Sequence, residues 1–481
     1  DRSVSRGLGD VYKRQIWRLW KMTKISFFNG LKEIGGTFVA IETESTKCMF
    51  DFGFAVAGRM DAKIRKRKDD FAVDYIRLGM LTPADGIYDK YTAEKTGLVP
   101  YGELGKECFF VISHMHIDHM GGLGCLHPDI PVYMSTDSLK LYRQLAKNGD
   151  VEHREHPNCI GVDYGAEFTV GDIKVKCVPV DHDIVGACGF LITTPDGNIC
   201  YTGDYRFHGF HPAYSEEFGK TCHGADVVIT EGVTASFEDI DMLSLEKPAE
   251  PDRTEEGLQE ELHAAAQEDN GLIVVNPYNR NVERVHRMIN TFKNGGRTLV
   301  LDPVQADYVA AFYPEDEIAV YEQTYNEACS DSSVVTENKP RICREGIPAG
   351  WKTVSREELL KNPSKYALQL DYADMYELTD LKDVISRYIH MDGAPLGAYD
   401  PSFAKMKEFL EVCGIAYDYK GLGGHAKPYY LRTMLDTIEP KTLIPLHSFR
   451  PEQVNTAKAG TRILPEYGDV YELKDGVVTK L

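Results

Sequence analysis

The 481-residue sequence lacks several features that mark other classes of protein. It has no run of 18 consecutive apolar residues, which argues against a membrane-spanning helix, and no CxxC pair among its eleven cysteines. No low-complexity tract interrupts it, which excludes a largely disordered scaffold. Because the cysteines lie mostly inside apolar runs, we expect reduced thiols and a cytoplasmic protein that does not bind membranes.

Basic residues are also scarce. The sequence has 54 Lys and Arg against 74 Asp and Glu, a net charge of −20, so a broad, non-specific attraction to a polyanion is not expected. Any contact with nucleic acid must therefore be local. The one basic cluster, residues 63–68, precedes two aspartates and is typical of a solvated helix face.

The length of the chain exceeds that of a single typical core and predicts two domains. Residues 1–21 show no apolar period, and we interpret them as a non-native or disordered tail.

The densest group of metal-binding side chains follows the apolar run 109–112. It contains His114, His116, Asp118 and His119. His114 and His116 are two residues apart, so on an extended segment they point the same way and can share one ion. Asp118 and His119 face a neighbouring position that suits a second ion. Two divalent ions about 3.5–4 Å apart are typical of enzymes that hydrolyse phosphate esters and some carbonyl compounds.

Other apolar runs also end in a possible ligand. These runs precede Asp51, His182, Asp204, Glu231 and His447. A single His or Asp at such a place is usually a turn or hydrogen-bonded residue. In layered α/β folds, however, the carboxyl ends of strands converge on one edge of the sheet, so the group together predicts one shared site.

Between Glu231 and His425 the pattern alternates between helix and strand. We predict helices over 254–269, 282–293, 306–312 and 402–412, and strands over 272–275, 298–301, 366–370 and 384–386. This order predicts a doubly wound parallel α/β domain inserted into the first domain.

In chain order, these motifs resemble those of the β-CASP branch of the metallo-β-lactamase fold, which includes ribonuclease J and the nucleases of mRNA 3′-end processing. The motifs are His114-x-His116-x-Asp118-His119, His182, Asp204, Glu231, Gly424-His425-Ala426 and Pro445-Leu446-His447. The resemblance implies an αββα sandwich with an inserted doubly wound α/β (β-CASP) domain. The sandwich would comprise residues 22–235 and 420–481, and the insert residues 236–419.

The resemblance also implies two zinc ions per chain. The expected ligands of the first are His114, His116 and His182, those of the second are Asp118, His119 and His447, and Asp204 would bridge both ions. Asp51 would orient a ligand imidazole.

Zinc lowers the pKa of bound water towards 7, which supplies a nucleophile at neutral pH. His425 is the expected proton donor to the departing ribose oxygen, and Glu231 would hold its tautomer. With Asp118, these two are the expected catalytic residues. The candidates for contact with substrate phosphates are Asn279, Arg280, Gly424, Lys427 and Ser448. Gly421 and Gly423 stand where ribonuclease J has His and Ser, and Ser448 stands where a Gly is usual.

We therefore expect a zinc-dependent ribonuclease that cleaves single-stranded RNA, as an endonuclease, a 5′-exonuclease or both, and that could form a homo-oligomer. The alternatives are a DNA-directed nuclease of the same branch and a hydrolase of a small ester or lactam. A metal-free RNA-binding subunit is the last-ranked alternative, because no expected ligand is missing.

Overall fold

The computed structural model describes residues 22–55, 66–249, 252–331 and 339–481. The predicted tail, residues 1–21, and the first half of the basic cluster, residues 63–65, lie outside the described residues. The second half, residues 66–68, is not helical, so the predicted helix is wrong there. Arg67 instead donates a hydrogen bond of 2.8 Å from its Nε to Asp74 of α2 (Phe71–Arg77), the helix that follows.

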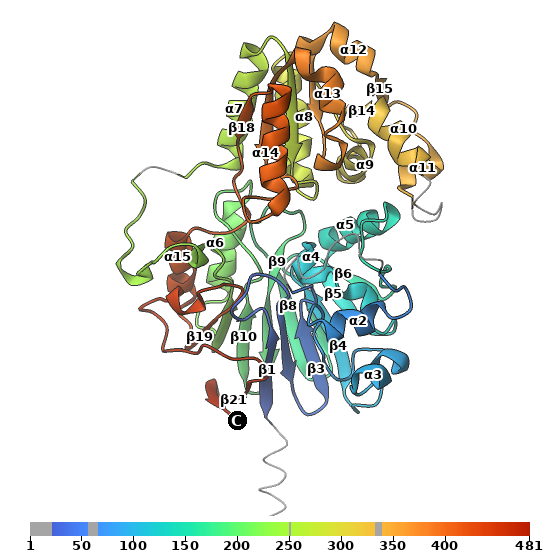
Figure 1. Ribbon diagram of the computed structural model, residues 1–481. Helices are drawn as coiled ribbons and strands as arrows, with labels where there is room; N and C mark the ends of the chain where they lie inside the picture. Colours follow the sequence, from blue (N-terminus) through green and yellow to red (C-terminus); the bar gives the residue numbers. More distant parts are fainter. Residues whose placement is uncertain (1–21, 56–65, 250–251, 332–338) are drawn as a thin grey trace, which may run out of the picture.

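Two β-sheets form a sandwich in the lower half of Figure 1. Within the described residues, the first has the order β22-β21-β1-β2-β3-β4-β5-β6 and the second the order β20-β19-β11-β10-β9-β8-β7. The strands of the first sheet are β1 (Thr23–Asn29), β2 (Phe38–Glu42), β3 (Thr46–Phe50), β4 (Glu107–Ile112), β5 (Val132–Ser135), β6 (Cys159–Val162), β21 (Val470–Lys474) and β22 (Val477–Lys480). Those of the second are β7 (Glu167–Val170), β8 (Ile173–Pro179), β9 (Cys188–Thr194), β10 (Gly197–Tyr201), β11 (Val227–Thr230), β19 (Thr442–Pro445) and β20 (Thr461–Arg462).

Strand β4 is apolar on both faces because each face contacts a different core. Phe109 and Val111 pack between the two sheets, whereas Phe110 and Ile112 pack under the helices. Side chains alternate along a strand, so a strand buried on both faces has a continuous apolar run. This burial leaves the polar residues at the end of the run, His114 onwards, as the first that can form a site.

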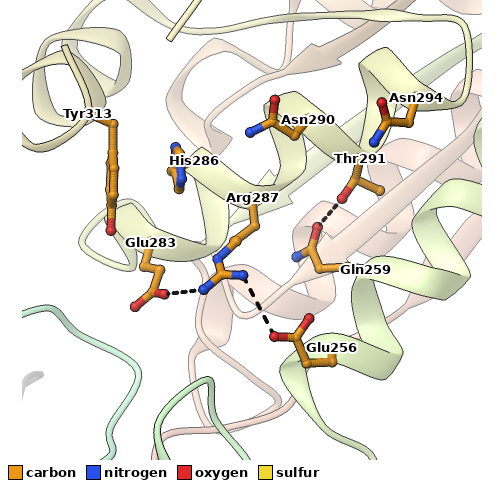
Figure 2. Close-up of a pocket in the computed structure, with 9 residues that line it drawn as sticks. All are labelled: Glu256, Gln259, Glu283, His286, Arg287, Asn290, Thr291, Asn294 and Tyr313. Atoms are coloured by element: carbon orange, nitrogen blue, oxygen red, sulfur yellow. Dashed lines mark hydrogen bonds and ion pairs between the residues drawn. The ribbon is translucent and has the colours of Figure 1, made fainter. Parts of the chain in front are cut away.

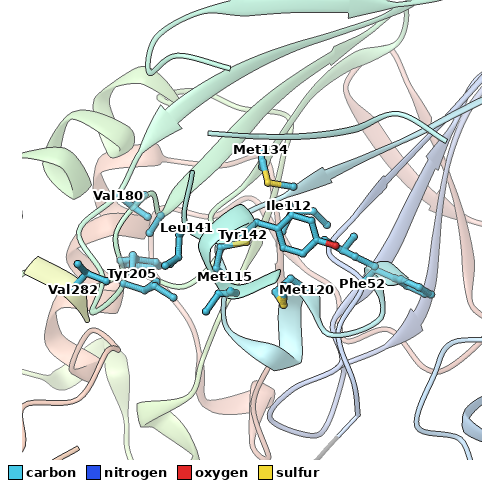
Figure 3. Close-up of a cluster of buried hydrophobic side chains, with 14 of the residues drawn as sticks. Phe52, Ile112, Met115, Met120, Met134, Leu141, Tyr142, Val180, Tyr205 and Val282 are labelled. Atoms are coloured by element: carbon cyan, nitrogen blue, oxygen red, sulfur yellow. The ribbon is translucent and has the colours of Figure 1, made fainter. Parts of the chain in front are cut away.

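Helices cover the outer face of each sheet. On the first sheet these are α2, α3 (Lys90–Thr96), α4 (Ile117–Met120) and α5 (Thr136–Lys147), and on the second α6 (Pro212–Thr221) and α15 (Pro428–Ile438). Part of the core beneath them includes Met115, Met120 and Tyr205 (Figure 3), each of which directly follows a predicted metal ligand in the sequence. The predicted αββα sandwich is thus confirmed.

The insert forms a separate layer above the sandwich in Figure 1. Its sheet has the order β13-β16-β12-β17-β18, and every neighbouring pair is parallel. The strands are β12 (Leu272–Pro277), β13 (Thr298–Val300), β16 (Tyr366–Gln369), β17 (Ile385–Met391) and β18 (Tyr417–Tyr419), and β14 (Ala319–Tyr321) and β15 (Lys352–Val354) form a small separate pair. The helices are α7 (Glu255–Glu268), α8 (Val282–Asn294), α9 (Pro303–Phe312), α10 (Glu322–Ser330), α11 (Arg341–Glu345), α12 (Arg356–Lys361), α13 (Glu377–Leu381) and α14 (Pro401–Cys413). Buried side chains cover both faces of the five-stranded sheet, as the doubly wound prediction requires.

The first residues assigned to the insert pack on the sandwich instead. Arg432 of α15 donates 2.8 Å to the carbonyl of Met242, and Gln453 accepts from the backbone N–H of Ile240. Helix α7 is therefore the first element that belongs to the inserted layer.

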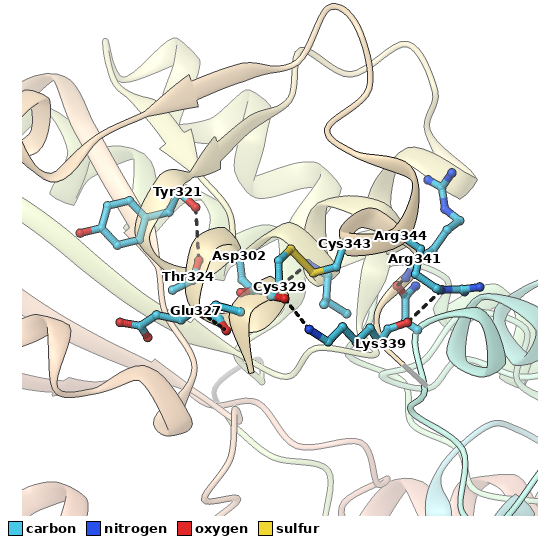
Figure 4. Close-up of a disulfide and its surroundings, with 12 residues drawn as sticks. Asp302, Tyr321, Thr324, Glu327, Cys329, Lys339, Arg341, Cys343 and Arg344 are labelled. Carbon is cyan, nitrogen blue, oxygen red and sulfur yellow. Dashed lines mark hydrogen bonds between the residues drawn. A yellow bond between two sulfur atoms is a disulfide. The ribbon is translucent and has the colours of Figure 1, made fainter. Parts of the chain in front are cut away.

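Two cysteines of the insert form a disulfide (Figure 4). Cys329, near the end of α10, and Cys343 of α11 have Cα atoms 4.9 Å apart, a separation that suits a disulfide. The prediction of reduced thiols is therefore wrong for this pair, because the sequence does not show that the two helices meet. The other nine cysteines are free.

Among the described residues, no helix combines the length and apolar character needed to cross a membrane.

Candidate metal centre

The predicted ligands lie on loops at the carboxyl ends of strands. His114 and His116 follow β4, and Asp118 and His119 lie on the short helix α4. His182, Asp204, Glu231 and His447 follow β8, β10, β11 and β19, which are strands of the second sheet. The loops of both sheets thus meet at one edge of the sandwich, below the insert (Figure 1).

Three imidazoles converge in the first group. The Nδ1 of His116 lies 3.1 Å from the Nε2 of His114 and 3.3 Å from the Nε2 of His182. Tetrahedral zinc with bonds of about 2.0–2.1 Å places its ligand nitrogens about 3.3 Å apart. The three nitrogens therefore have the separation of ligands that share one ion.

Hydrogen bonds to the opposite ring nitrogens orient two of these imidazoles. The Nδ1 of His182 donates to the carbonyl of Gly424 at 2.5 Å, and the Nδ1 of His114 lies 2.9 Å from the Oγ of Ser113. Because the Ser113 hydroxyl donates its own hydrogen to Asp51 at 2.8 Å, its oxygen accepts from His114. The Nε2 atoms of both histidines therefore keep lone pairs for a ligand.

The second group consists of Asp118, His119 and His447, with Asp204 beside it. The Oδ2 of Asp204 lies 3.2 Å from the Nε2 of His119 and 3.4 Å from that of His447. It also lies 3.8 Å from the Nε2 of His114, in the first group. Asp204 is thus within reach of both groups, as a bridging carboxylate must be.

Asp51 connects the two groups from behind. It is fully buried, and its Oδ2 accepts from the Nδ1 of His119 at 2.7 Å, from the Ser113 hydroxyl and from the Tyr201 hydroxyl. Asp51 therefore orients His119 directly and His114 through Ser113. The sequence predicted the role of Asp51 but did not indicate Ser113 or Tyr201, which lie on other elements.

Thr37 performs the corresponding task for His447. Its hydroxyl lies 3.0 Å from the Nδ1 of His447, and the backbone N–H of Gly35 lies 3.2 Å from the same atom. The Gly35 N–H donates to this nitrogen, and the two contacts hold the ring with its Nε2 towards Asp204.

Several ring nitrogens have no hydrogen-bond partner. The Nε2 atoms of His119 and His447 are buried and unpartnered among the described residues. Buried polar atoms are almost always paired, so unpaired nitrogens that converge on carboxylates need another partner. Imidazoles and carboxylates are ligands of zinc and related divalent ions. The residues therefore fit a divalent metal centre.

The electrostatics agree with neutral imidazoles in the first group, whereas in the second group Asp204, Asp118 and Asp51 outweigh burial and raise the pKa of His119. Burial lowers the pKa of His116 to about 3 and that of His182 to about 4, and it also lowers the pKa of His114. Neutral rings keep the lone pair that a metal needs.

Asp183 is an acidic neighbour that the sequence analysis did not single out. Its Oδ1 lies 3.3 Å from the Nε2 of His182 and 3.5 Å from the Nε2 of His116. Burial would raise the pKa of this carboxyl, but the two imidazoles outweigh burial and lower it. With its Nδ1 facing the first group, His116 turns its Nε2 towards the Oδ1 of Asp183, but neither of these two atoms has a hydrogen-bond partner among the described residues. The sequence feature that could have indicated Asp183 is its position directly after His182, at the end of a strand.

Glu231 and His425 form a pair beside these groups. The Nδ1 of His425 lies 3.2 Å from the Oε2 of Glu231 and 3.8 Å from the Oδ2 of Asp204. Glu231 is buried, whereas the His425 side chain is 24% exposed. Burial opposes a charged ring, but Glu231 and then Asp204 raise the pKa of His425 to about 9. His425 is therefore both accessible and held by a carboxylate.

Comparisons with known proteins agree with this geometry. A model of the β-lactamase superfamily domain matches residues 103–266, which include His114 to Glu231 but not His425 or His447. Ribonuclease J from Pyrococcus abyssi is 26% identical over 239 residues, 46% of this chain and 48% of that protein. Ribonuclease J from Methanocaldococcus jannaschii is 21% identical and covers 94% of this chain and 97% of its own. A solved Enterococcus faecalis protein of unknown function has a TM-score of 0.74 at 27% identity and covers 94% of this chain and 100% of its own.

The chain is thus similar to ribonuclease J, and its residues 103–266 match the β-lactamase superfamily domain. Its inserted parallel domain is the β-CASP domain that the ribonuclease J relatives imply. The fold also implies the use of divalent metal ions. The chain spans about half the length of the first curated relatives that it matches, 48% and 44%.

Two of the residues expected to contact substrate phosphates are buried and already have partners within the chain. Arg280 is buried, and its guanidinium donates 2.7 Å to the carbonyl of Met115 and 3.2 Å to Asp150. Ser448 is fully buried, and its Oγ lies 2.8 Å from that of Ser236. A phosphate contact by either residue stays a prediction, and it would require these bonds to break.

The other three candidates also have partners within the chain. Asn279 donates 2.8 Å to Asp371, and Lys427 pairs with Asp252. Gly424 uses its carbonyl for His182, and a Cβ on it would lie 2.6 Å from that ring. Its role is therefore close approach to a ligand imidazole.

A hollow of about 350 Å³ lies between α7 and α8 (Figure 2). Among its lining residues, Arg287 pairs with Glu283 and Glu256. It contains none of the predicted site residues.

Proposed function

We propose that this protein is a zinc-dependent ribonuclease that hydrolyses phosphodiester bonds of single-stranded RNA with two metal ions. The observation that carries the proposal is the His425–Glu231 pair, 3.8 Å from Asp204. A metal centre alone would suit many hydrolases of this superfamily. A proton donor held beside it suits a substrate with a poor leaving group, such as a ribose oxygen. The ribonuclease J relatives support the same substrate.

The ligand assignment that we propose follows the two groups. His114, His116 and His182 would hold one ion, Asp118, His119 and His447 the other, and Asp204 both. When bound, two such ions lower the pKa of water and neutralise charge on the phosphate. Asp118, whose side chain is 28% exposed, would lie at the open side of the centre, where substrate enters.

The remaining steps belong to the chain's own side chains. His425 would donate its proton to the departing ribose oxygen, and Glu231 would accept the hydrogen bond from the Nδ1 and stabilise the charged ring before transfer. His182 is fixed by Gly424, the residue before His425, so the ligand and the proton donor share one loop.

The insert would form one wall of the substrate cleft. Tyr278, which follows β12 of the insert, has its ring 5.2 Å from that of His116. The edge of the inserted sheet therefore lies directly above the metal centre. We propose a domain boundary between β18, which ends at Tyr419, and the loop that carries His425.

The test is a cleavage assay on end-labelled RNA and DNA of equal sequence, read at single-nucleotide resolution. The purified protein is stripped with a chelator and reloaded with zinc. We expect RNA cleavage that the chelator abolishes and zinc restores, and the product ladder separates endonuclease from 5′-exonuclease action. Cleavage of DNA but not of RNA would show that DNA is the substrate. Absence of cleavage of both polymers would refute the proposal of a nuclease.

A further inference from the structure

We propose that a buried chain of four charged side chains, Arg206, Glu255, Arg284 and Asp392, positions the loop that carries His425. This proposal rests on the proposed function only in the role it gives to His425. The four residues act on the loop and not on the substrate, so they are positioning residues. Three of them, Glu255, Arg284 and Asp392, belong to the insert, and Arg206 belongs to the sandwich.

The charges alternate along the chain. The Nη2 of Arg206 donates to the Oε1 of Glu255 at 2.8 Å, and the Nη2 of Arg284 donates to the same oxygen at 2.8 Å. The Nη1 of Arg284 then donates to the Oδ2 of Asp392 at 3.1 Å. Arg206, Glu255 and Arg284 are each no more than 1% exposed. The chain therefore connects the two domains through their buried interface.

Both ends of this chain hold the same loop. At one end, the Nη1 of Arg206 donates to the carbonyl of Gly423 at 2.9 Å. At the other end, the Oδ2 of Asp392 accepts from the backbone N–H of Leu422 at 2.8 Å and of Gly423 at 3.4 Å. A Cβ on Gly421 would lie 2.1 Å from the Oδ1 of Asp392, so only glycine allows this approach. The loop is thus bound from two sides, directly before Gly424 and His425.

The four charged side chains do more than join the two domains, because they also fix the arrangement of the loop. The two arginines face two carboxylates along the chain, and a third buried carboxylate, Asp181, lies 3.8 Å from the Nε of Arg206. Asn281 adds a hydrogen bond of 3.3 Å to Glu255. Buried ion pairs are stable only when such hydrogen bonds satisfy them, and loss of one partner leaves an uncompensated charge. The chain therefore has one well-defined arrangement, and the loop bound to it has one as well.

The position of the loop matters at both candidate centres. Gly424 accepts the hydrogen bond from His182, and His425 contacts Glu231. A shift of this loop would move the proton donor relative to the scissile bond, and a misplacement of about 1 Å can cost about 100-fold in rate. The insert would thus control catalysis through Asp392, apart from any contact that it makes with RNA.

The experiment compares Asp392→Gly with a matched control, Asp269→Ala. Asp392 has a φ of +64°, which glycine tolerates, so Asp392→Gly removes the carboxylate without backbone strain. Asp269 is also a mostly buried carboxylate of the insert, and it pairs with Arg387 at the opposite end of β17 from Asp392. Asp392→Asn, which keeps one oxygen acceptor for the loop, should restore part of any loss.

The first readout does not depend on activity. The rate of amide hydrogen exchange in the peptide 420–427, measured by mass spectrometry, should rise about tenfold or more in Asp392→Gly. The reason is that two backbone N–H groups of this peptide lose the carboxylate oxygen that accepts their hydrogen bonds. It should stay unchanged in Asp269→Ala. Unchanged exchange in Asp392→Gly would overturn the proposal.

The second readout is catalytic. We expect Asp392→Gly to lower kcat on RNA by about 10- to 100-fold but to change kcat on a nitrophenyl phosphodiester by less than about threefold. In the His425→Ala background, Asp392→Gly should cause no further loss. Two results would overturn the role of Asp392 in positioning His425. One is an equal loss of kcat on both substrates, and the other is a full additional loss of kcat when Asp392→Gly is added to His425→Ala. Faster exchange in a protein that cleaves no RNA would support the positioning of the loop and refute the nuclease.

Discussion

Replacement of His425 by alanine should reduce RNA cleavage strongly without removing metal. A general acid contributes about 10²–10⁴-fold, or about 2.7–5.5 kcal/mol of activation free energy. The imidazole lies 3.8 Å from Asp204 and forms a possible ligand group with Asp204 and Glu231, but the proposed assignment gives it no ion. The His425→Ala protein should therefore keep its full metal content while its kcat on RNA falls by that factor.

Glu231→Gln should cause a smaller loss. The Oε2 of Glu231 accepts from both His425 and the backbone N–H of Val233 at 3.1 Å, and the Oε1 accepts from the backbone N–H of Tyr205 at 3.2 Å. A glutamine must present its NH₂ group to one of these donors. Hydrogen bonds to charged groups contribute about 1.5–3 kcal/mol, so we expect a loss of about 10- to 100-fold. The double variant should be little worse than His425→Ala, because the two residues act as a unit.

The assay compares two substrates at saturating concentration. A nitrophenyl phosphodiester has a good leaving group that needs little protonation, so His425→Ala should affect it much less than RNA. His223→Ala is the control, because His223 is an exposed histidine outside both groups. Equal losses on both substrates would make His425 a binding residue. Unchanged activity on both would refute the argument for a nuclease.

Three further predictions concern metal affinity, pH and thiols. Asp51→Asn should weaken metal binding about 10- to 100-fold, measured by competition with a chelator, because Asp51 orients His119 and His114; unchanged affinity would contradict this. Burial and then Asp371 raise the pKa of the Asp302 carboxyl to about 7, above its value in the unfolded chain. The folded protein therefore holds this proton more tightly, and the free energy of unfolding should fall as pH rises from about 4 to 7. Asp302→Asn should flatten the pH dependence of the unfolding free energy over that range, and an unchanged slope would contradict the shift. Thiol titration of the oxidised, denatured protein should find nine thiols, and eleven would exclude the Cys329–Cys343 disulfide.

Sequence patterns predicted the inserted sheet and the strands that lead to the site, because strands buried on both faces leave long apolar runs, whereas the αββα sandwich was implied by the family resemblance. The same pattern indicated His114 to His119 as site residues, because polar residues directly after such an apolar run must lie at a sheet edge. Strand ends converge in this architecture, so distant residues such as Asp204 and His447 could be assigned to one site before their separation was known.

The hydrogen-bond and ion-pair partners of the side chains were much harder to predict than the positions of the residues in the fold. Arg280 has the charge that a phosphate contact needs, but the sequence does not show that Met115 and Asp150 already occupy its guanidinium. Lys427 and its partner Asp252 are a similar case. Side-chain pairing depends on tertiary packing, which no periodicity records.

The buried network behind the site was missed for the same reason. Glu255 and Arg284 look like ordinary polar residues near helix starts, yet both are fully buried and paired. Asp392 follows a strand end as the predicted ligands do, but the predicted strand ended at 386, whereas β17 extends to Met391. An accurate strand end would have indicated Asp392 as a candidate.

The most direct test of the account is the location of the ions themselves. Crystals of the zinc-loaded protein, measured on both sides of the zinc absorption edge, should give two anomalous peaks per chain. We expect one peak among His114, His116 and His182, the other among Asp118, His119 and His447, and Asp204 between them. A single peak, or peaks away from these residues, would contradict the two-metal centre on which the proposed function depends.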